Sequence, residues 1–247
     1  MPVLVAPVMG TTVSLDVRDH GAEVELLERA VERLRELEAR FTTYREDSEI
    51  RRLDRGELAL ADTHPEVREV LAACEVLRAE SDGAFDARRE GRLDPSGYVK
   101  GWAGERAADL LREAGLRDFS IVLGGDVVCA GEREPGAPWR VGVRHPDDPG
   151  RMLVVLGIRD GAVATSGLYE RGAHVVDART GEVPTIWRSI TVTAGSLATA
   201  DAVATAALAM GEAGPEWAAR RLGCGVAALH ADGRLMTSPA LEALRVA

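Results

Sequence analysis

The chain has 247 residues, and its 40 Asp and Glu residues outnumber its 30 Lys and Arg residues, which gives a formal net charge of −10. A chain of this length folds as one large domain or two small ones and buries a core without disulfides or structural metals. The apolar fraction of 46% excludes general disorder. The acidic balance argues against nucleic acids and anionic membranes as partners, because both would be repelled. The longest apolar runs are shorter than the about 20 residues that a membrane span requires.

The N-terminal segment and the cysteines bear on location. Residues 1–10 contain an apolar run without a preceding basic residue, so they do not match a secretory signal. Cys74, Cys129 and Cys224 are odd in number and share no close spacing, which predicts reduced thiols rather than disulfides or a zinc site. Together these features predict a cytoplasmic protein.

The first half of the chain predicts strands followed by helices. Alternating β-branched residues are typical of strands, and apolar residues at intervals of three and four are typical of amphipathic helices. Thr63 followed by Pro65 is a helix-start pattern, with Thr63 as the N-cap. The predicted elements are, in chain order, strands at 2–8 and 11–17 and helices at 22–41, 65–81 and 99–114.

The second half is dominated by short strands with tight turns such as Asp160-Gly161 and Asp232-Gly233. Because hairpins outnumber strand–helix–strand units, the sequence predicts an α+β fold with mainly antiparallel sheets and packed helices. No linker interrupts it, so one domain is predicted over residues 1–247. The predicted elements are, in chain order, strands at 119–123, 127–130, 139–143, 152–158 and 162–165, helices at 197–210 and 215–222, and strands at 225–229 and 234–237.

Asp201 and Thr205 are four residues apart in a predicted helix and therefore lie on one face. A carboxylate and a hydroxyl form an oxygen pair that suits a hard cation such as Mg²⁺. The alternative is that Thr199 caps the helix and Asp201 is a first-turn acid stabilised by the helix dipole.

Lys100 is the only lysine in the chain. It is predicted near the start of a helix that Asp94 or Ser96 could cap, where a cation is unfavourable for the helix dipole. This placement indicates a bound anion or a carboxylate partner. The alternative is an ordinary capped helix with a solvated lysine.

Other candidate residues carry weaker signals. The Gly-Gly-Asp sequence at 124–126 is typical of a turn between strands, although bare backbone also admits a ligand. The isolated His174 is either structural or catalytic. Phe85 and Tyr44 follow helical segments and either belong to the core or stack on a flat ligand.

Taken in order, these fragments resemble one family, the ApbE-type FAD:protein FMN transferases. The resemblance covers nearly the whole chain, and its specificity comes from the order of the motifs. The matching segments are MGT at 9–11, FTTYREDS at 41–48, GAFD at 83–86, D-x-S-G-x-x-K-G at 94–101, GGD at 124–126, TSG at 165–167, YER at 169–171, HVVDARTG at 174–181 and ADxxAT at 200–205.

The resemblance implies an ApbE-like, T-fold-like architecture and a set of binding residues. Mg²⁺ would be held by Asp201, Thr205 and the Gly97 carbonyl, near the pyrophosphate of FAD. The residues that would bind FAD are Met9, Tyr44, Ala84, Phe85, Asp86, Asp94, Lys100 and Val176.

The resemblance also implies the reaction, in which FMN is transferred from FAD to a Ser or Thr hydroxyl of an acceptor flavoprotein with release of AMP. The acceptor hydroxyl needs a base, for which His174 is the candidate and Asp177 the competitor. Two alternatives remain open on the same residues. One is a Mg²⁺-dependent FAD pyrophosphatase, in which water replaces the acceptor, and the other is an FAD-binding or storage protein without turnover.

Overall fold

The computed structural model describes residues 1–168 and 175–246. Its central feature is one eight-stranded sheet. The strands of this sheet are β1 (Val3–Val8), β2 (Thr11–Val17), β5 (Phe119–Leu123), β6 (Asp126–Ala130), β9 (Gly161–Gly167), β10 (Trp187–Ala194), β11 (Gly225–His230) and β12 (Leu235–Thr237). They lie in the order β1-β2-β5-β6-β9-β10-β11-β12, and each pairs with its neighbours in antiparallel orientation.

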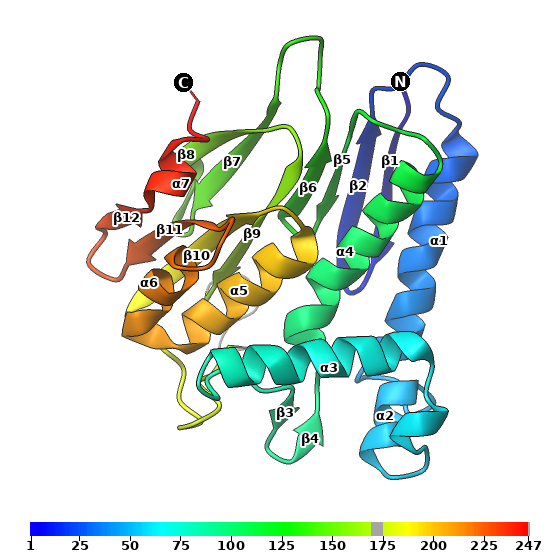
Figure 1. Ribbon diagram of the computed structural model, residues 1–247, viewed down its shortest axis with the longest axis vertical. Coiled ribbons are helices and arrows are strands. Elements are labelled where there is room, and N and C mark those ends of the chain that lie inside the picture. The colour runs from blue at the N-terminus through cyan, green and yellow to red at the C-terminus, as the bar shows by residue number, and fades with distance from the viewer. Residues whose placement is uncertain (169–174, 247) are drawn as a thin grey trace.

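Helices cover one face of this sheet, and a separate hairpin covers part of the other (Figure 1). The hairpin consists of β7 (Trp139–His145) and β8 (Asp148–Ile158), and a second small hairpin consists of β3 (Arg88–Arg89) and β4 (Arg92–Leu93). The helices are α1 (Val24–Phe41), α2 (Glu49–Asp54), α3 (Pro65–Glu80), α4 (Ser96–Glu113), α5 (Leu197–Ala209), α6 (Gly214–Ala219) and α7 (Pro239–Glu242), with short 3₁₀ turns at Leu60–Asp62 and Gly211–Ala213.

The apolar patterns of the sequence account for the main core. In α1, the residues at intervals of three and four that include Leu27, Leu34 and Leu37 are fully buried. In β2, alternate residues from Val13 to Val17 face the same side and are also fully buried. The helical layer and the sheet therefore enclose one large apolar cluster, and a smaller cluster around Trp139 and Leu156 lies between the sheet and the β7–β8 hairpin.

Helices α4 and α5 cross at unusually close range, and glycine makes this possible. A Cβ atom at Gly101 would lie 2.5 Å from Asp201 Cβ and 2.6 Å from the Leu197 carbonyl oxygen, both in α5. One turn further along α4, a Cβ atom at Gly104 would lie 2.7 Å from Leu197 Cδ2. Glu105 adds a polar contact, because its carboxylate accepts the Leu197 N–H at 2.5 Å. The crossing thus joins the backbone of α4 directly to the first turns of α5.

The predicted fold class is confirmed, and most predicted elements occur within a few residues of their expected bounds. Helix α4 begins at Ser96, three residues before the predicted start, and its N-cap is Pro95 without a side-chain cap, so the prediction of Asp94 or Ser96 as the cap is wrong. The Asp94 carboxylate accepts the Ser96 N–H at 3.0 Å just before the helix. The predicted N-cap Thr63 is wrong: His64 is the N-cap of α3, and its Nδ1 accepts the Glu66 N–H at 3.3 Å. The sequence analysis did not predict β10, α2, α7 or the β3–β4 hairpin.

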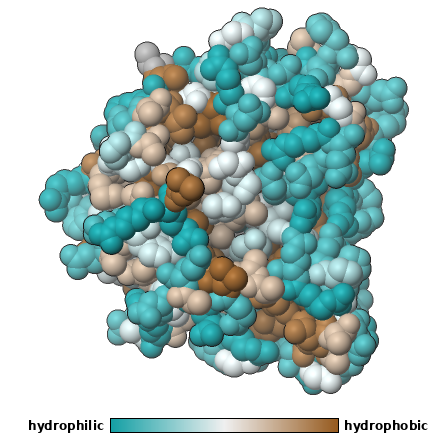
Figure 2. Space-filling model, in the orientation of Figure 1, coloured by the Kyte–Doolittle hydropathy of each residue, from teal (hydrophilic) through white to brown (hydrophobic). Residues whose placement is uncertain are grey.

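The three cysteines are free thiols, as the sequence predicted, and all three are buried. Burial raises the pKa of the Cys74 and Cys129 thiols to about 12, so both are protonated and unreactive at neutral pH. On the face shown in Figure 2, apolar areas are small and separated by hydrophilic side chains. Within the described residues, we find no helix with the length and apolar character needed to cross a membrane.

We expect Gly101→Ala to lower the free energy of unfolding by about 1–3 kcal/mol, because the added methyl group forces α4 and α5 apart. Urea denaturation monitored by circular dichroism measures this. Gly195→Ala is the matched control, since a Cβ atom at Gly195 would meet no atom within 4 Å. Its effect should stay within about 0.5 kcal/mol. Equal stability of the two variants would contradict the close crossing.

Candidate active site

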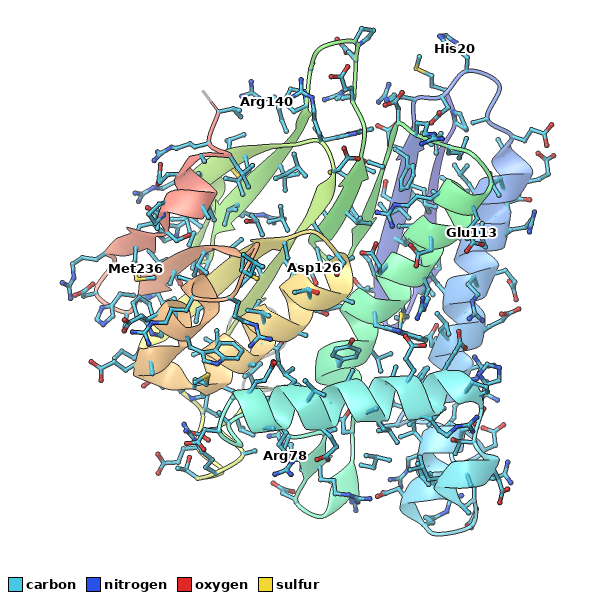
Figure 3. All side chains as sticks on the ribbon, viewed as in Figure 1. His20, Arg78, Glu113, Asp126, Arg140 and Met236 are labelled. Atoms are coloured by element: carbon cyan, nitrogen blue, oxygen red, sulfur yellow. The ribbon has the colours of Figure 1, made fainter. Side chains whose placement is uncertain are left out.

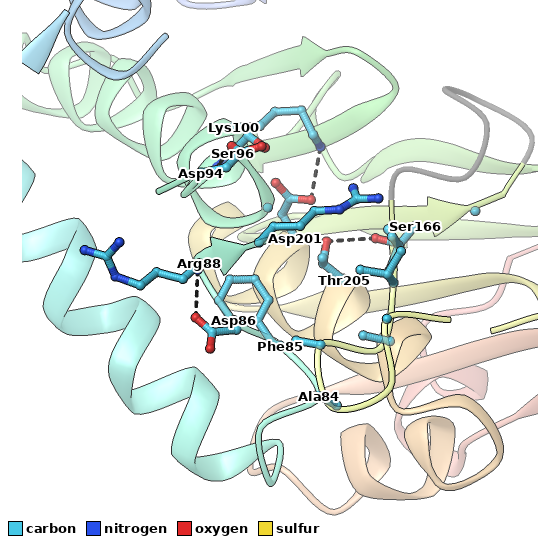
Figure 4. A pocket seen from close by; sticks show the side chains of 18 of the residues that line it. Ala84, Phe85, Asp86, Arg88, Asp94, Ser96, Lys100, Ser166, Asp201 and Thr205 are labelled. Atoms are coloured by element: carbon cyan, nitrogen blue, oxygen red, sulfur yellow. Dashed lines mark hydrogen bonds and ion pairs between the residues drawn. The ribbon is translucent and has the colours of Figure 1, made fainter. Parts of the chain in front are cut away.

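A cavity of about 480 Å³ opens where α4 and α5 meet strand β9 and the segments around residues 84–96 and 175–181. Its volume is in the range of small-molecule and cofactor sites. Most of the predicted site residues line it, namely Tyr44, Ala84, Phe85, Asp86, Asp94, Gly97, Lys100, Val176, Asp201 and Thr205. The structure therefore brings together residues that are up to 161 positions apart in the chain (Figure 4).

The charged centre of the cavity is formed by Lys100 of α4 and two carboxylates. Lys100 Nζ lies 3.1 Å from Asp201 Oδ1 and forms a second ion pair with Asp126 of β6. Both carboxylate side chains are almost fully buried, with 3–4% of their surface exposed, whereas the Lys100 side chain is 25% exposed. Two carboxylates against one ammonium leave this group with a net charge of −1.

The two alternatives that treated Lys100 and Asp201 as ordinary helix residues are wrong. Lys100 is ion-paired and partly buried rather than solvated. The N-cap of α5 is Ser196, whose hydroxyl accepts the Thr199 N–H at 3.2 Å, so Thr199 is not the cap. Asp201 consequently lies beyond the first turn, and its carboxylate interacts with α4 rather than with the N-terminus of its own helix.

The predicted metal ligands lie around the same charged centre. Asp201 Oδ2 accepts the Gly101 N–H at 2.8 Å, which fixes the carboxylate. In a regular α-helix, the Gly101 N–H would donate to the Gly97 carbonyl oxygen. Because a carbonyl oxygen has two lone pairs, the Gly97 oxygen has room for another ligand. The Thr205 hydroxyl shares a hydrogen bond of 3.0 Å with the Ser166 hydroxyl on β9.

This donor set fits a hard cation in composition and charge. A buried carboxylate, a hydroxyl one helical turn away and a nearby main-chain carbonyl are the oxygen ligands that Mg²⁺ accepts. In the part of the chain that the structure describes, no group of three or more His, Cys, Asp or Glu side chains could hold a metal by itself. A metal here would therefore depend on Thr205 and the Gly97 carbonyl as well as on Asp201.

The apolar wall of the cavity comes from Phe85 and its neighbours. Phe85 is 6% exposed, and its N–H donates to the Ser81 hydroxyl at 3.1 Å. A Cβ atom at Gly97 would lie 3.1 Å from Phe85 Cε2 and 3.3 Å from Thr205 Cγ2, so glycine lets the first turn of α4 pack against both. Tyr44 also lines the cavity and is 96% exposed, so its ring is accessible to a flat ligand.

Asp86 and Asp94 shape the backbone at the edge of the cavity. Asp86 Oδ1 accepts the Arg88 N–H at 2.7 Å, and Asp94 Oδ1 accepts the Ser96 N–H. Each carboxylate thus stabilises a turn, one at the start of β3 and one at the start of α4. Their predicted role in FAD binding stays a prediction.

Three predicted residues lie elsewhere or are not described. Met9 lies in the two-residue turn between β1 and β2 and has a φ of 53°. It is not one of the described residues that line the cavity. His174 lies outside the described residues. Asp177 lies within the described residues but is not among those that line the cavity.

The carboxylate of Asp177 is held by Arg179. It accepts the Arg179 backbone N–H and the guanidinium Nε, each at 2.9 Å, and the guanidinium Nη2 at 2.7 Å. The Arg179 guanidinium lowers the pKa of Asp177 below its usual range. A carboxylate with a lowered pKa is a weaker proton acceptor, which disfavours Asp177 as a general base.

Several residues of the site had no role in the sequence analysis. Asp126 ends the Gly-Gly-Asp turn, in which Gly124 and Gly125 both have positive φ angles. Thr165 and Ser166 belong to the TSG segment, and both line the cavity. The motifs themselves were visible in the sequence, but their side chains meet only after β6 and β9 pair in the sheet.

The class of protein follows from the family model. Residues 9–91 and 87–229 match the model of the ApbE family. These two segments make up most of the chain, so the protein belongs to the ApbE family, as the resemblance of the motifs implied.

Curated relatives of this chain carry the name FAD:protein FMN transferase. The relative from Vibrio cholerae is 29% identical over 168 residues, which cover 64% of this chain and 50% of the relative. The relative from Rhodobacter capsulatus is 33% identical over 164 residues, which cover 62% of this chain and 31% of the relative. The chain thus spans half or less of the length of these two relatives.

Solved structures show the same architecture. The flavin transferase ApbE from Vibrio cholerae superposes with a TM-score of 0.84 over 98% of both chains, at 23% identity. The ApbE protein from Thermotoga maritima superposes with a TM-score of 0.88 over 100% of this chain and 99% of that one, at 21% identity. These likenesses confirm the ApbE-like fold.

We expect Asp177→Asn to reduce the free energy of unfolding at pH 7 by at most about 1 kcal/mol. The pKa of this carboxylate is lowered in the folded state, so its contribution is present above the unfolded value of ~3.9 and is lost as the pH falls through the folded pKa. The difference from wild type should therefore shrink as the pH falls below ~3.9. Urea denaturation at pH 7 and at acidic pH measures it, with Asp47→Asn at the more exposed Arg45 pair as the control. A difference that persists at low pH would contradict this account.

Proposed function

We propose that this protein is a Mg²⁺-dependent FAD:protein FMN transferase. In this reaction the oxygen of a Ser or Thr hydroxyl on an acceptor flavoprotein bonds to the phosphorus of the FMN half of FAD. The bond from that phosphorus to the bridging oxygen breaks, and AMP leaves with that oxygen. The hydroxyl proton passes to a base. The names of the curated relatives support this proposal.

The observation that carries the proposal is the charge of the cavity. Its described lining contains four carboxylates, of Asp86, Glu90, Asp94 and Asp201, against the three cations of Arg88, Arg89 and Lys100. The buried Asp126 behind Lys100 adds a further negative charge. This excess of negative charge would repel a pyrophosphate, so an additional cation would favour the binding of FAD. A divalent metal that binds together with the substrate supplies such a cation.

In this proposal, Asp201, Thr205 and the Gly97 carbonyl hold the metal. Bound Mg²⁺ supplies charge neutralisation on the pyrophosphate oxygens, which lowers the barrier to phosphoryl transfer. Lys100 is the nearby cation of α4 and donates to a phosphate oxygen. Phe85, Tyr44 and Val176 provide apolar and aromatic surface for the flavin ring.

His174 is the proposed base that accepts the proton of the acceptor hydroxyl. The unperturbed pKa of histidine, ~6.5, suits proton transfer near neutral pH. Asp177 is less suitable, because its carboxylate is occupied by Arg179 and its pKa is lowered.

A cytoplasmic location stays a prediction.

We expect the purified protein to convert FAD and a protein acceptor into AMP and flavinylated acceptor. The assay combines the protein with FAD and Mg²⁺, with and without an acceptor protein of the Vibrio cholerae relative. Mass spectrometry of the acceptor and chromatography of the nucleotides identify the products. Free FMN and AMP without acceptor would indicate the pyrophosphatase instead, and unchanged FAD in both mixtures would indicate a binding protein.

We expect Asp201→Asn to reduce turnover by orders of magnitude, because the amide keeps the shape of the side chain but loses the charge that holds a hard cation. Mg²⁺ with FAD should raise the melting temperature of the wild type and not that of the variant. Asp109→Asn is the control, since Asp109 forms half-buried ion pairs with Arg106 and Arg112 and does not line the cavity. Full activity of Asp201→Asn, or of the wild type in excess chelator, would end the metal assignment.

A further inference from the structure

Asp126 is a buried carboxylate with two partners and no place in the described cavity lining. It is the first residue of β6, directly after the Gly124-Gly125 turn, and it is 2% exposed. In Figure 3, Asp126 is labelled near the middle of the view, beside α5, whereas His20 is labelled at the edge. One carboxylate oxygen accepts the Thr165 N–H at 3.0 Å, and the other forms the ion pair with Lys100. The contact with Thr165 needs only a hydrogen-bond acceptor, whereas the contact with Lys100 depends on a negative charge.

The contact with Thr165 does not require a charge. The ladder between β6 and β9 ends at the pair Val127 and Val163, so the Thr165 N–H lies beyond the last paired residues of these strands. The Asp126 side chain supplies the acceptor for this partly buried N–H. An amide oxygen in the same position would serve equally well.

The contact with Lys100 does depend on charge. Lys100 Nζ is shared between Asp126 and Asp201, and Asp201 is the carboxylate assigned to the metal. If Asp126 were neutral, the ammonium would be attracted to Asp201 alone, and this pair would have no net charge. The same change would lower the attraction of the site for a divalent cation.

We propose that Asp126 is a positioning residue that holds the Lys100 ammonium, so that Asp201 keeps the negative charge that a divalent cation needs. The inference rests on the metal site of the proposed function and assigns the Asp of the Gly-Gly-Asp turn a role that acts through Lys100. Asp126 does not touch the ligand in this arrangement, because Lys100 lies between it and the cavity.

The test is Mn²⁺ binding without FAD, measured by electron paramagnetic resonance on wild type, Asp126→Asn, Lys100→Met and the double variant. Asp126→Asn should weaken Mn²⁺ binding by about tenfold or more, because the Lys100 ammonium is then attracted to Asp201 alone and neutralises the carboxylate assigned to the cation. In the Lys100→Met background, Asp126→Asn should weaken Mn²⁺ binding by at most about twofold to threefold, because no ammonium remains that could pair with Asp201 alone. Thermal melts check the folding of each variant. Asp118→Asn is the matched control, since Asp118 also accepts a backbone N–H, that of Glu132, away from the cavity.

A second readout uses the fact that Lys100 is the only lysine. Lysine labelled with ¹³C at Cε gives a single side-chain signal in the full chain. Asp126→Asn should shift this signal without added metal, and Asp118→Asn should not. This measurement decides the question even where Lys100→Met fails to fold.

The outcomes separate this inference from the proposed function. Wild-type Mn²⁺ binding that is unchanged in Asp126→Asn, or an equal loss with and without Lys100, would overturn the inference and leave the proposed function standing. An unmoved Lys100 signal in Asp126→Asn would do the same. Absence of Mn²⁺ binding by the wild type, with or without FAD, would overturn the metal assignment and the inference together.

Discussion

The close crossing of α4 and α5 is the constraint on which the site depends. Because Gly101 has no side chain, the backbone of α4 comes within reach of Asp201, and its N–H binds the carboxylate directly. The same approach places Lys100, one residue earlier, beside the other oxygen of that carboxylate. Gly97, one turn before Gly101, gives Phe85 and Thr205 room against the helix. A side chain at these glycines would separate the elements whose contact forms the cavity.

A second consequence of this crossing is the burial of charge. Asp126 and Asp201 are almost fully removed from water, and a carboxylate in such a position is costly unless it is paired and hydrogen-bonded. Each has a backbone N–H, from Thr165 and Gly101 respectively, and both share Lys100. The two N–H groups and one ammonium stabilise the carboxylates without neutralising the group. The remaining negative charge distinguishes this group from a closed structural ion pair.

The sheet supplies the other half of the site. Strand β6 leaves its turn with Asp126 directed to the helical layer, and β9 brings Thr165 and Ser166 alongside. Ser166 then orients the Thr205 hydroxyl across the boundary between sheet and helix. The antiparallel order of the strands therefore decides which hydroxyl groups face α5. The β3–β4 hairpin and the segment around Val176 complete the cavity from outside this framework.

Local sequence patterns determined the helices and strands with strong periodicity and the antiparallel α+β class. The amphipathic spacing of α1 and the glycine turns require only neighbouring residues, so they are legible in the chain itself. Most of the residues that line the cavity were predicted from the order of their motifs, which resemble those of a known family. Strand β10 was not predicted, although its residues from Ser189 to Thr193 are buried.

Only the tertiary structure decided which charges meet. Lys100, Asp126 and Asp201 are far apart in the sequence, and no local pattern shows that one ammonium serves two carboxylates. The sequence likewise allowed Thr199 as a cap and Asp177 as a base. The fold made Ser196 the cap and bound Asp177 to Arg179. The physical reason is that local propensity acts over one or two turns, whereas burial and ion pairing depend on how the helices and the sheet pack.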